Sequence, residues 1–144
     1  MLNGIFSFII YDNLDKKVFC VRDRLGVKPL FYTNNNGSYY FCSEIKGILK
    51  IFNNNKVNLS NVQFYLETTF YDTSNETFYE NIFQLEQSTC LVIDLESNKV
   101  EKIKYWDIEN NENYEENILD NFLTNSFTIQ QRSDTKLGLN VSSG

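Results

Sequence analysis

The sequence predicts an α+β protein in which antiparallel strands come first and helices follow. Three observations favour this class. β-Branched and aromatic residues fill short segments of the first forty positions, an Asn-Gly dipeptide separates two such segments, and apolar residues recur at helical spacing further along the chain. The chain has 144 residues. This length corresponds to about one domain of roughly 150 residues and allows a substantial core.

Two hairpins are expected in the first third of the chain. Residues 4–11 are apolar on both faces, which is typical of a strand inside a sandwich, and a turn over 12–15 joins them to a strand over 17–21. A second hairpin is expected over 31–42 around Asn36-Gly37, because both of these residues tolerate a positive φ. Together these strands predict an antiparallel meander.

Two helices are expected next. Ser43 can cap a short helix that runs toward Phe52, and either Asn58 or Ser60 can cap a second helix that reaches Phe70. The second helix has an apolar stripe at helical spacing, which we expect to lie in the core. The stripe comprises Val62, Tyr65, Leu66 and Thr69.

The rest of the chain predicts a strand pair over 89–95 and 100–105, a helix over 115–131, and a strand over 136–142 that ends in a Ser-Gly turn. Between the strand pair and the helix, residues 107–116 are acidic and rich in Asn. This composition is typical of a linker between domains.

Charge and hydropathy exclude several classes of partner. Thirteen Lys and Arg against nineteen Asp and Glu give a net charge of −6, so no basic face is available for a nucleic acid. The longest apolar run, residues 5–11, is far shorter than the roughly 20 residues of a membrane-spanning helix. The first four residues lack the basic start of a signal peptide. We therefore expect a soluble, cytoplasmic protein with neither a nucleic-acid nor a membrane partner.

The residue types present also exclude some chemistry. The chain has no His, which removes Ser-His-Asp triads and zinc sites with a His ligand. Cys20, Cys42 and Cys90 are odd in number, widely spaced and set among apolar neighbours. This pattern favours reduced, buried thiols over a disulfide framework, and no spacing of a metal site accompanies it.

Residues 22–32 form the densest cluster of charge, with a Gly and a Pro among them. One interpretation is a rigid turn in which Asp23 pairs with Arg22 or Arg24 at the surface. The other is a loop that shapes a polar pocket, although no nucleophile lies close to it in the sequence.

The second candidate site is at the end of the chain, in residues Val141, Ser142, Ser143 and Gly144. Small residues after a strand leave backbone N–H groups free to converge on an anion, and a following helix would add its dipole. The four residues therefore predict part of a phosphate-binding loop.

Five signals occur in the same order as in one enzyme family, and together they make the chain resemble glutamine-hydrolysing asparagine synthetase over nearly all of its length. They are Arg22-Asp23-x-Leu25-Gly26-x-Lys28-Pro29-Leu30, Ser43-Glu44-Ile45-Lys46, Tyr105-Trp106, Arg132-Ser133-Asp134 with Gly138, and Val141-Ser142-Ser143-Gly144.

The resemblance implies two domains. The first is a class II glutamine amidotransferase with an N-terminal-nucleophile αββα sandwich, which releases ammonia from glutamine. The second is an α/β domain that activates aspartate with ATP and Mg²⁺. Residues 1–106 would be the later half of the first domain, 107–114 a linker, and 115–144 the first helix and strand of the second domain.

The resemblance transfers few site residues. The family's nucleophile is a cysteine at the mature N-terminus, whereas Cys20, Cys42 and Cys90 are predicted inside strands, so no catalytic residue is assigned. Val141, Ser142, Ser143 and Gly144 match the start of the loop that holds the ATP phosphates.

By this resemblance the chain is expected to be a fragment truncated within both domains. It should be inactive alone and bind neither ATP nor Mg²⁺. Glutamine, aspartate and ATP would be substrates of the full-length enzyme, and the fragment could require a complementary chain or form a homo-oligomer.

Two alternatives stay open. Asparagine-synthetase-like enzymes such as β-lactam synthetases and lasso-peptide cyclases share the two-domain plan and form other amides. A non-catalytic interaction module is the other possibility, because a fold does not determine a function.

Overall fold

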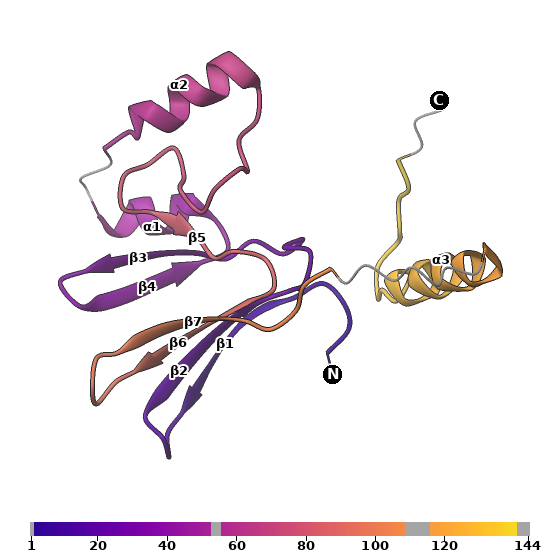
Figure 1. The fold of residues 1–144 in the computed structure, drawn as a ribbon, viewed down its shortest axis with the longest axis horizontal. Helices are drawn as coiled ribbons and strands as arrows, with labels where there is room; N and C mark the ends of the chain where they lie inside the picture. Colours follow the sequence, from indigo (N-terminus) through magenta and orange to yellow (C-terminus); the bar gives the residue numbers. More distant parts are fainter. Residues whose placement is uncertain (1, 53–55, 109–115, 141–144) are drawn as a thin grey trace. The chain divides into compact units, whose positions relative to one another are not determined.

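The computed structural model describes residues 2–52, 56–108 and 116–140. The chain divides into two compact units, residues 5–107 and residues 108–144 with the first four, and each is described by itself. In the larger unit two β-sheets face each other, and α1 lies on the outer side of one of them (Figure 1). With antiparallel sheets and helices in the described residues, the predicted α+β class is confirmed.

Sheet A has four antiparallel strands in the order β1-β2-β6-β7. They are β1 (Ser7–Asp12), β2 (Lys17–Arg22), β6 (Thr89–Asp94) and β7 (Val100–Lys104). Both the first predicted hairpin and the predicted late strand pair are confirmed.

Sheet B has three antiparallel strands in the order β4-β3-β5, namely β3 (Phe31–Asn35), β4 (Ser38–Cys42) and β5 (Phe83–Gln84). Asn36 and Gly37 turn the β3-β4 hairpin with φ angles of 51° and 84°, as predicted from the dipeptide. The short strand β5 was not predicted, because two residues carry no periodicity.

The expected single meander is wrong. β2 and β3 lie in different sheets, and residues 23–30 carry the chain from one sheet to the other. The partner that β2 gains instead is β6, from much later in the chain. A local sequence pattern predicts that a segment forms a strand, but it does not predict which distant strand will pair with it.

The main core lies between the two sheets. In the register of sheet A, Cys20 of β2 stands opposite Ile9 of β1 and Leu91 of β6. Each fully buried large apolar side chain stabilises the fold by about 1.5–3 kcal/mol. The buried residues of this cluster are Cys20, Leu30, Tyr32, Leu85, Leu91 and Ile93.

Burial of β1 on both faces was expected and is wrong. Ile9, Ile10 and Tyr11 are 45%, 54% and 53% exposed. β1 is an edge strand whose one strand partner among the described residues is β2. The apolar residues that predicted a central strand are therefore present, but the described part of the chain does not cover them.

Helix α1 (Ile45–Ile51) begins later than predicted. Glu44 occupies the N-cap position without a side-chain capping bond, so the expected Ser43 cap is wrong. The Glu44 carboxylate pairs instead with Nζ of Lys46. Residues 53–55, which follow the expected end of this helix at Phe52, lie outside the described residues.

Helix α2 (Leu59–Thr68) has the Asn58 cap that was one of the two expected, because the Asn58 side chain accepts a hydrogen bond from Asn61 N at 3.2 Å. The helix has no buried residue, and Tyr65 and Leu66 are 39% and 74% exposed, so its expected role in the core is wrong. Polar contacts at the N-terminal end hold it, including Asn58 N to Phe78 O at 2.9 Å.

In the second unit, α3 (Glu116–Gln130) confirms the predicted helix. A strand was expected over 136–142. Residues 136–140, the part of that segment that the structure describes, form neither helix nor strand. A strand needs a paired neighbour, and the described residues of this unit include no other strand. Within the described ranges, no helix is long and apolar enough to cross a membrane.

The three cysteines are free, as expected. Cys20 is buried, whereas Cys42 and Cys90 are only half-buried, so the expected burial is confirmed for one of the three. Burial, with a smaller contribution from nearby Cys90, raises the pKa of Cys20 to about 12. The Cys20 thiol is therefore protonated and unreactive at neutral pH.

Gly47 in α1 predicts an unusual mutational result. Replacing Gly by Ala inside a helix normally stabilises it by up to about 1 kcal/mol. Here an added Cβ would clash with Sγ of Cys42. Gly47→Ala should therefore lower the free energy of unfolding by about 1–3 kcal/mol, measured by urea denaturation. In a Cys42→Ala background the same change should be stabilising, and a loss of equal size there would contradict this explanation.

Candidate functional site

The buried carboxylate of Asp23 organises the loop that joins the two sheets. Its Oδ1 accepts hydrogen bonds from the backbone N–H groups of Leu25 at 3.2 Å and Val27 at 3.0 Å. Its Oδ2 accepts from Lys28 N at 2.8 Å and Phe6 N at 3.3 Å. Asp23 is 2% exposed, so these four donors replace the water that a carboxylate requires.

The protonation of Asp23 follows from the same contacts. Burial raises the pKa of a carboxyl group, because it disfavours the charged form. The backbone N–H groups of Lys28, Val27, Phe6 and Leu25 together outweigh burial and hold the pKa of Asp23 below its ordinary value. Asp23 is therefore ionised at neutral pH.

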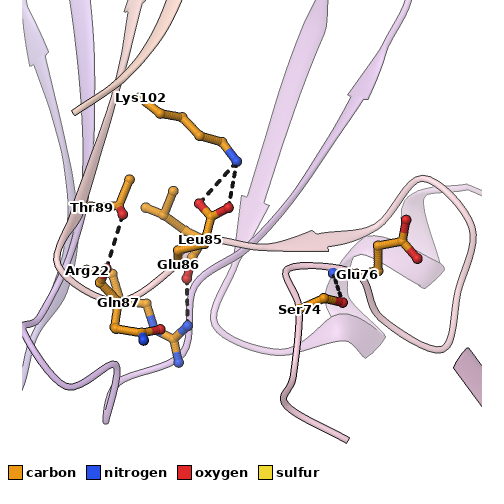
Figure 2. A network of polar contacts seen from close by, with 8 residues as sticks. All are labelled: Arg22, Ser74, Glu76, Leu85, Glu86, Gln87, Thr89 and Lys102. Carbon is orange, nitrogen blue, oxygen red and sulfur yellow. Dashed lines mark hydrogen bonds and ion pairs between the residues drawn. The ribbon is translucent and has the colours of Figure 1, made fainter. Parts of the chain in front are cut away.

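Arg22 holds the same loop from the other side. Its guanidinium donates from Nε to Lys28 O at 3.1 Å and from Nη2 to Gly26 O at 2.5 Å. Nη1 donates to Leu85 O at 2.6 Å, which ties the loop to the segment before β6 (Figure 2). One side chain thus joins residues more than sixty positions apart in the sequence.

Gln84 completes the set of Arg22 acceptors. Its side-chain amide satisfies its neighbours when the oxygen faces Arg22 and the nitrogen faces Asp72. The oxygen then accepts from Nη1 at 3.0 Å and Nη2 at 2.7 Å, and the nitrogen donates to Asp72 Oδ1 at 3.1 Å. All five N–H donors of Arg22 are then used within the protein, so the guanidinium is a clamp and not a ligand-binding group.

The expected pairing of Asp23 with Arg22 or Arg24 at the surface is wrong. Asp23 and Arg22 are both buried, and the contacts of each go chiefly to the backbone. Gly26 fits this arrangement for two reasons. Its φ is +67°, and an added Cβ would lie 3.0 Å from the Arg22 guanidinium.

The structure brings a second sequence signal to this loop. Tyr105 donates from its hydroxyl to Arg22 O at 2.5 Å, and the Trp106 ring lies 5.7 Å from the guanidinium of Arg24. Ser88 donates from its backbone N to Asp23 O at 3.0 Å and from Oγ to Arg24 O at 2.8 Å. We call residues 22–28 with Gln84, Ser88 and Tyr105 the crossover clamp.

A polar cavity of about 560 Å³ lies beside the clamp, consistent with the alternative interpretation of a pocket-shaping loop. Glu86, which lines the cavity, forms an ion pair with Lys102, whose Nζ lies 3.0 Å from Glu86 Oε1 (Figure 2). Lys104 contacts Asp107 at 2.5 Å. The lining residues are Arg22, Asp72, Thr73, Ser74, Asn75, Gln84, Leu85, Glu86, Gln87, Thr89 and Lys104.

This cavity offers hydrogen bonds but no nucleophile with a base. No cysteine lines it, the chain has no His, and its charged groups already have partners within the protein. Among the described residues, no three Asp, Glu, Cys or His side chains converge as a metal site requires. The clamp and its cavity are a structural site that shapes the domain.

The second sequence candidate is not part of the described structure. Val141, Ser142, Ser143 and Gly144 lie outside the described residues. Sequence reasoning missed Asp72, Gln84 and Ser88. No sequence pattern marks these three residues. Ser88 adopts a φ of +58°, a conformation usually reserved for Gly or Asn, so the residue type itself gives no sign of it.

Comparison with known proteins identifies the class to which this fold and loop belong. Residues 1–106 match the family model of the glutamine amidotransferase domain, and the chain belongs to this family. Individual relatives of the chain have names that specify one enzyme within this family. A protein of Methanocaldococcus jannaschii, provisionally named as glutamine-hydrolysing asparagine synthetase 2, is 34% identical over 150 residues, which cover 99% of this chain and 29% of that protein.

Two relatives come from Bacillus subtilis. Glutamine-hydrolysing asparagine synthetase 2 is 32% identical over 157 residues, covering 98% of this chain and 21% of that protein. Glutamine-hydrolysing asparagine synthetase 3 is 56% identical over 48 residues, covering 33% of this chain and 8% of that protein. The chain thus spans less than a third of the length of these curated relatives.

Asp23→Asn should lower the free energy of unfolding by about 2–3 kcal/mol at neutral pH, because an amide nitrogen would face backbone N–H donors. The folded-state pKa of Asp23 is lowered, so its stabilisation is complete above the unfolded pKa of about 3.9 and is lost as pH falls through the folded value. The difference between wild type and variant should therefore shrink in acid. Asp15→Asn, at an exposed position, is the control. Urea denaturation at several pH values gives the free energy of unfolding of the wild type and of both variants.

Substitutions of Ser88 should separate its hydrogen bond from its backbone strain. Ser88→Ala loses the bond to Arg24 O and keeps the positive φ, which should destabilise the fold by about 1 kcal/mol. Ser88→Gly loses the same bond but relieves roughly 1 kcal/mol of strain, so its melting temperature should stay close to that of the wild type. An alanine variant that melts above the glycine variant would contradict this assignment.

Proposed function

We propose that the chain forms part of a glutamine-hydrolysing asparagine synthetase, with glutamine as the source of ammonia. The supporting observation is that relatives of this name align over 99% and 98% of the chain, well beyond the 106 residues of the amidotransferase match. The complete enzyme would convert aspartate, glutamine and ATP to asparagine, glutamate, AMP and pyrophosphate. The three free cysteines are compatible with the cytoplasm.

The finer organisation is also a proposal. Residues 1–106 would form the later half of an N-terminal-nucleophile αββα sandwich, which the facing sheets A and B support. Residues 107–114 would be a linker, and α3 would begin the synthetase domain in residues 115–144. The alignments beyond residue 106 support this second domain.

ATP and Mg²⁺ are proposed as cofactors of the complete enzyme. Val141, Ser142, Ser143 and Gly144 would present backbone N–H groups to the phosphates, and the ATP would activate the aspartate side chain. We expect this chain alone to bind neither ATP nor Mg²⁺, because a phosphate site also requires the helix that follows such a loop.

The chain's own cysteines cannot supply an N-terminal nucleophile. Cys20, Cys42 and Cys90 lie within β2, β4 and β6, where each α-amino group is part of a peptide bond. Burial raises the pKa of both Cys20 and Cys90, which further opposes thiolate formation. We assign residues 5–107 a positioning role, in which the crossover clamp sets the shape of the amidotransferase domain.

The isolated chain should release no ammonia from glutamine. Incubation of the purified protein with glutamine, followed by an enzymatic ammonia assay, checks this expectation, with the intact Bacillus subtilis asparagine synthetase 2 as the positive control. Sustained release above a heat-denatured sample would show that the cysteine assignment is wrong.

A graft tests the proposed family role directly. Residues 5–107 would replace the matching segment of Bacillus subtilis asparagine synthetase 2, and the chimera should retain glutamine-dependent ammonia release. The same chimera with Asp23→Asn should fold less stably and release less ammonia, because the crossover loop loses its carboxylate. A stably folded chimera that forms no glutamate from glutamine would sink the proposal.

A further inference from the structure

The chain is held tightly at the point where it leaves sheet A. β7 is exposed along its whole length and ends at Lys104, whereas Tyr105 and Trp106 directly after it are half-buried. Tyr105 makes two hydrogen bonds there. Its backbone N donates to Ser88 O at 2.8 Å, and its hydroxyl donates to Arg22 O at 2.5 Å, across 83 positions of sequence.

The state of the Tyr105 hydroxyl suits this role. Burial, with a smaller contribution from the Asp23 carboxylate, raises the pKa of Tyr105 above its ordinary value. The phenol is therefore protonated at neutral pH and can donate to the Arg22 carbonyl. Its acceptor belongs to the same loop that Asp23 organises, so the attachment ends on a rigid part of the unit.

Trp106 continues the attachment. Its ring lies 5.7 Å from the guanidinium of Arg24, whose buried Nε has no hydrogen-bond partner among the described residues. An aromatic face stabilises such a cation. Lys104 and Asp107 form an ion pair across the two aromatic residues. Contacts of the side chains thus hold residues 104–107, the last four of the larger unit.

We propose that Tyr105 and Trp106 are positioning residues, which fix the end of the amidotransferase domain from which the linker starts and so keep ammonia release coupled to asparagine formation. This role rests on the proposed function, in which residues 107–114 join two domains and the second domain consumes ammonia released in the first. Ammonia that escapes into water is lost to the coupled reaction, so the yield of asparagine depends on how the linker constrains the two domains.

The length of the linker makes the anchor important. Release of Tyr105 and Trp106 would add two residues to a linker of about eight, and two extended residues add up to about 7 Å of reach. The effective concentration of one tethered domain at the other falls as the tether lengthens. Loss of the anchor should therefore leave glutamine hydrolysis intact and lower the transfer of ammonia.

Hydrogen exchange on the 144-residue chain tests the anchor itself. Tyr105→Phe removes the hydroxyl and keeps the ring, and it should speed exchange of the residue 105 amide about three- to tenfold while amides of β2 and β6 keep their rates. Tyr71→Phe is the matched control, because its side chain is 73% exposed and its loss of a hydroxyl should change neither. An unchanged residue 105 amide, or equal acceleration throughout β2 and β6, would overturn the local anchor.

The chimera that carries residues 5–107 tests coupling. With glutamine, aspartate and ATP present, Tyr105→Phe should raise the ratio of glutamate to asparagine formed about twofold or more, and Tyr105→Phe with Trp106→Leu should raise it further. The rate of glutamate formation should stay the same. With ammonium chloride in place of glutamine, the chimera and its variants should form asparagine at equal rates, because the synthetase domain is unaltered.

The outcomes separate this role from the proposed function. An unmodified chimera that forms no glutamate contradicts the proposed function, and the coupling role fails with it. If the unmodified chimera is active, an unchanged ratio in the variants overturns the coupling role alone. Equal losses of glutamate and asparagine, or unequal rates with ammonium chloride, would show general damage to the enzyme and would also overturn it.

Discussion

The fold of residues 5–107 depends on how one buried carboxylate is satisfied. Asp23 gathers backbone N–H groups from the loop that follows it and from Phe6 just before β1. This loop is where the chain leaves sheet A for sheet B, so the same hydrogen bonds determine the start of both hairpins. Without an internal partner, an ionised group this deeply buried would destabilise the fold.

Arg22 extends this local order across the molecule. Its guanidinium reaches Leu85 O, and Tyr105 returns a hydrogen bond to the Arg22 carbonyl. Residues from the start, middle and end of the unit thereby share one small buried region. Such a network is strong because the Arg22 guanidinium and the Asp23 carboxylate are satisfied by partners within the protein, and it leaves neither charge free for catalysis in the cavity beside it.

Features with local causes could be predicted from the sequence. Asn36-Gly37 determines its own turn, Asn58 caps its own helix, and the apolar spacing of α3 is contained in that helix. Features with distant causes could not. The burial of Arg22, the pairing of β2 with β6 and the strand β5 depend on residues far along the chain. The candidate site shows the same difference between local and distant causes. Its loop over residues 22–32 could be identified in the sequence, whereas Gln84 and Ser88, which contact that loop from far along the chain, could not.

The register of β2 against β6 has a consequence for synthesis. A hairpin such as β1-β2 can form within about 10 μs, but β6 emerges about 70 residues later, roughly 4–14 s afterwards at ordinary ribosomal rates. During that interval the β2 edge lacks its β6 partner, and the core face that β6 shares with β2 is incomplete. The apolar surface of this hairpin is therefore exposed for longer during synthesis than that of a protein built from local contacts.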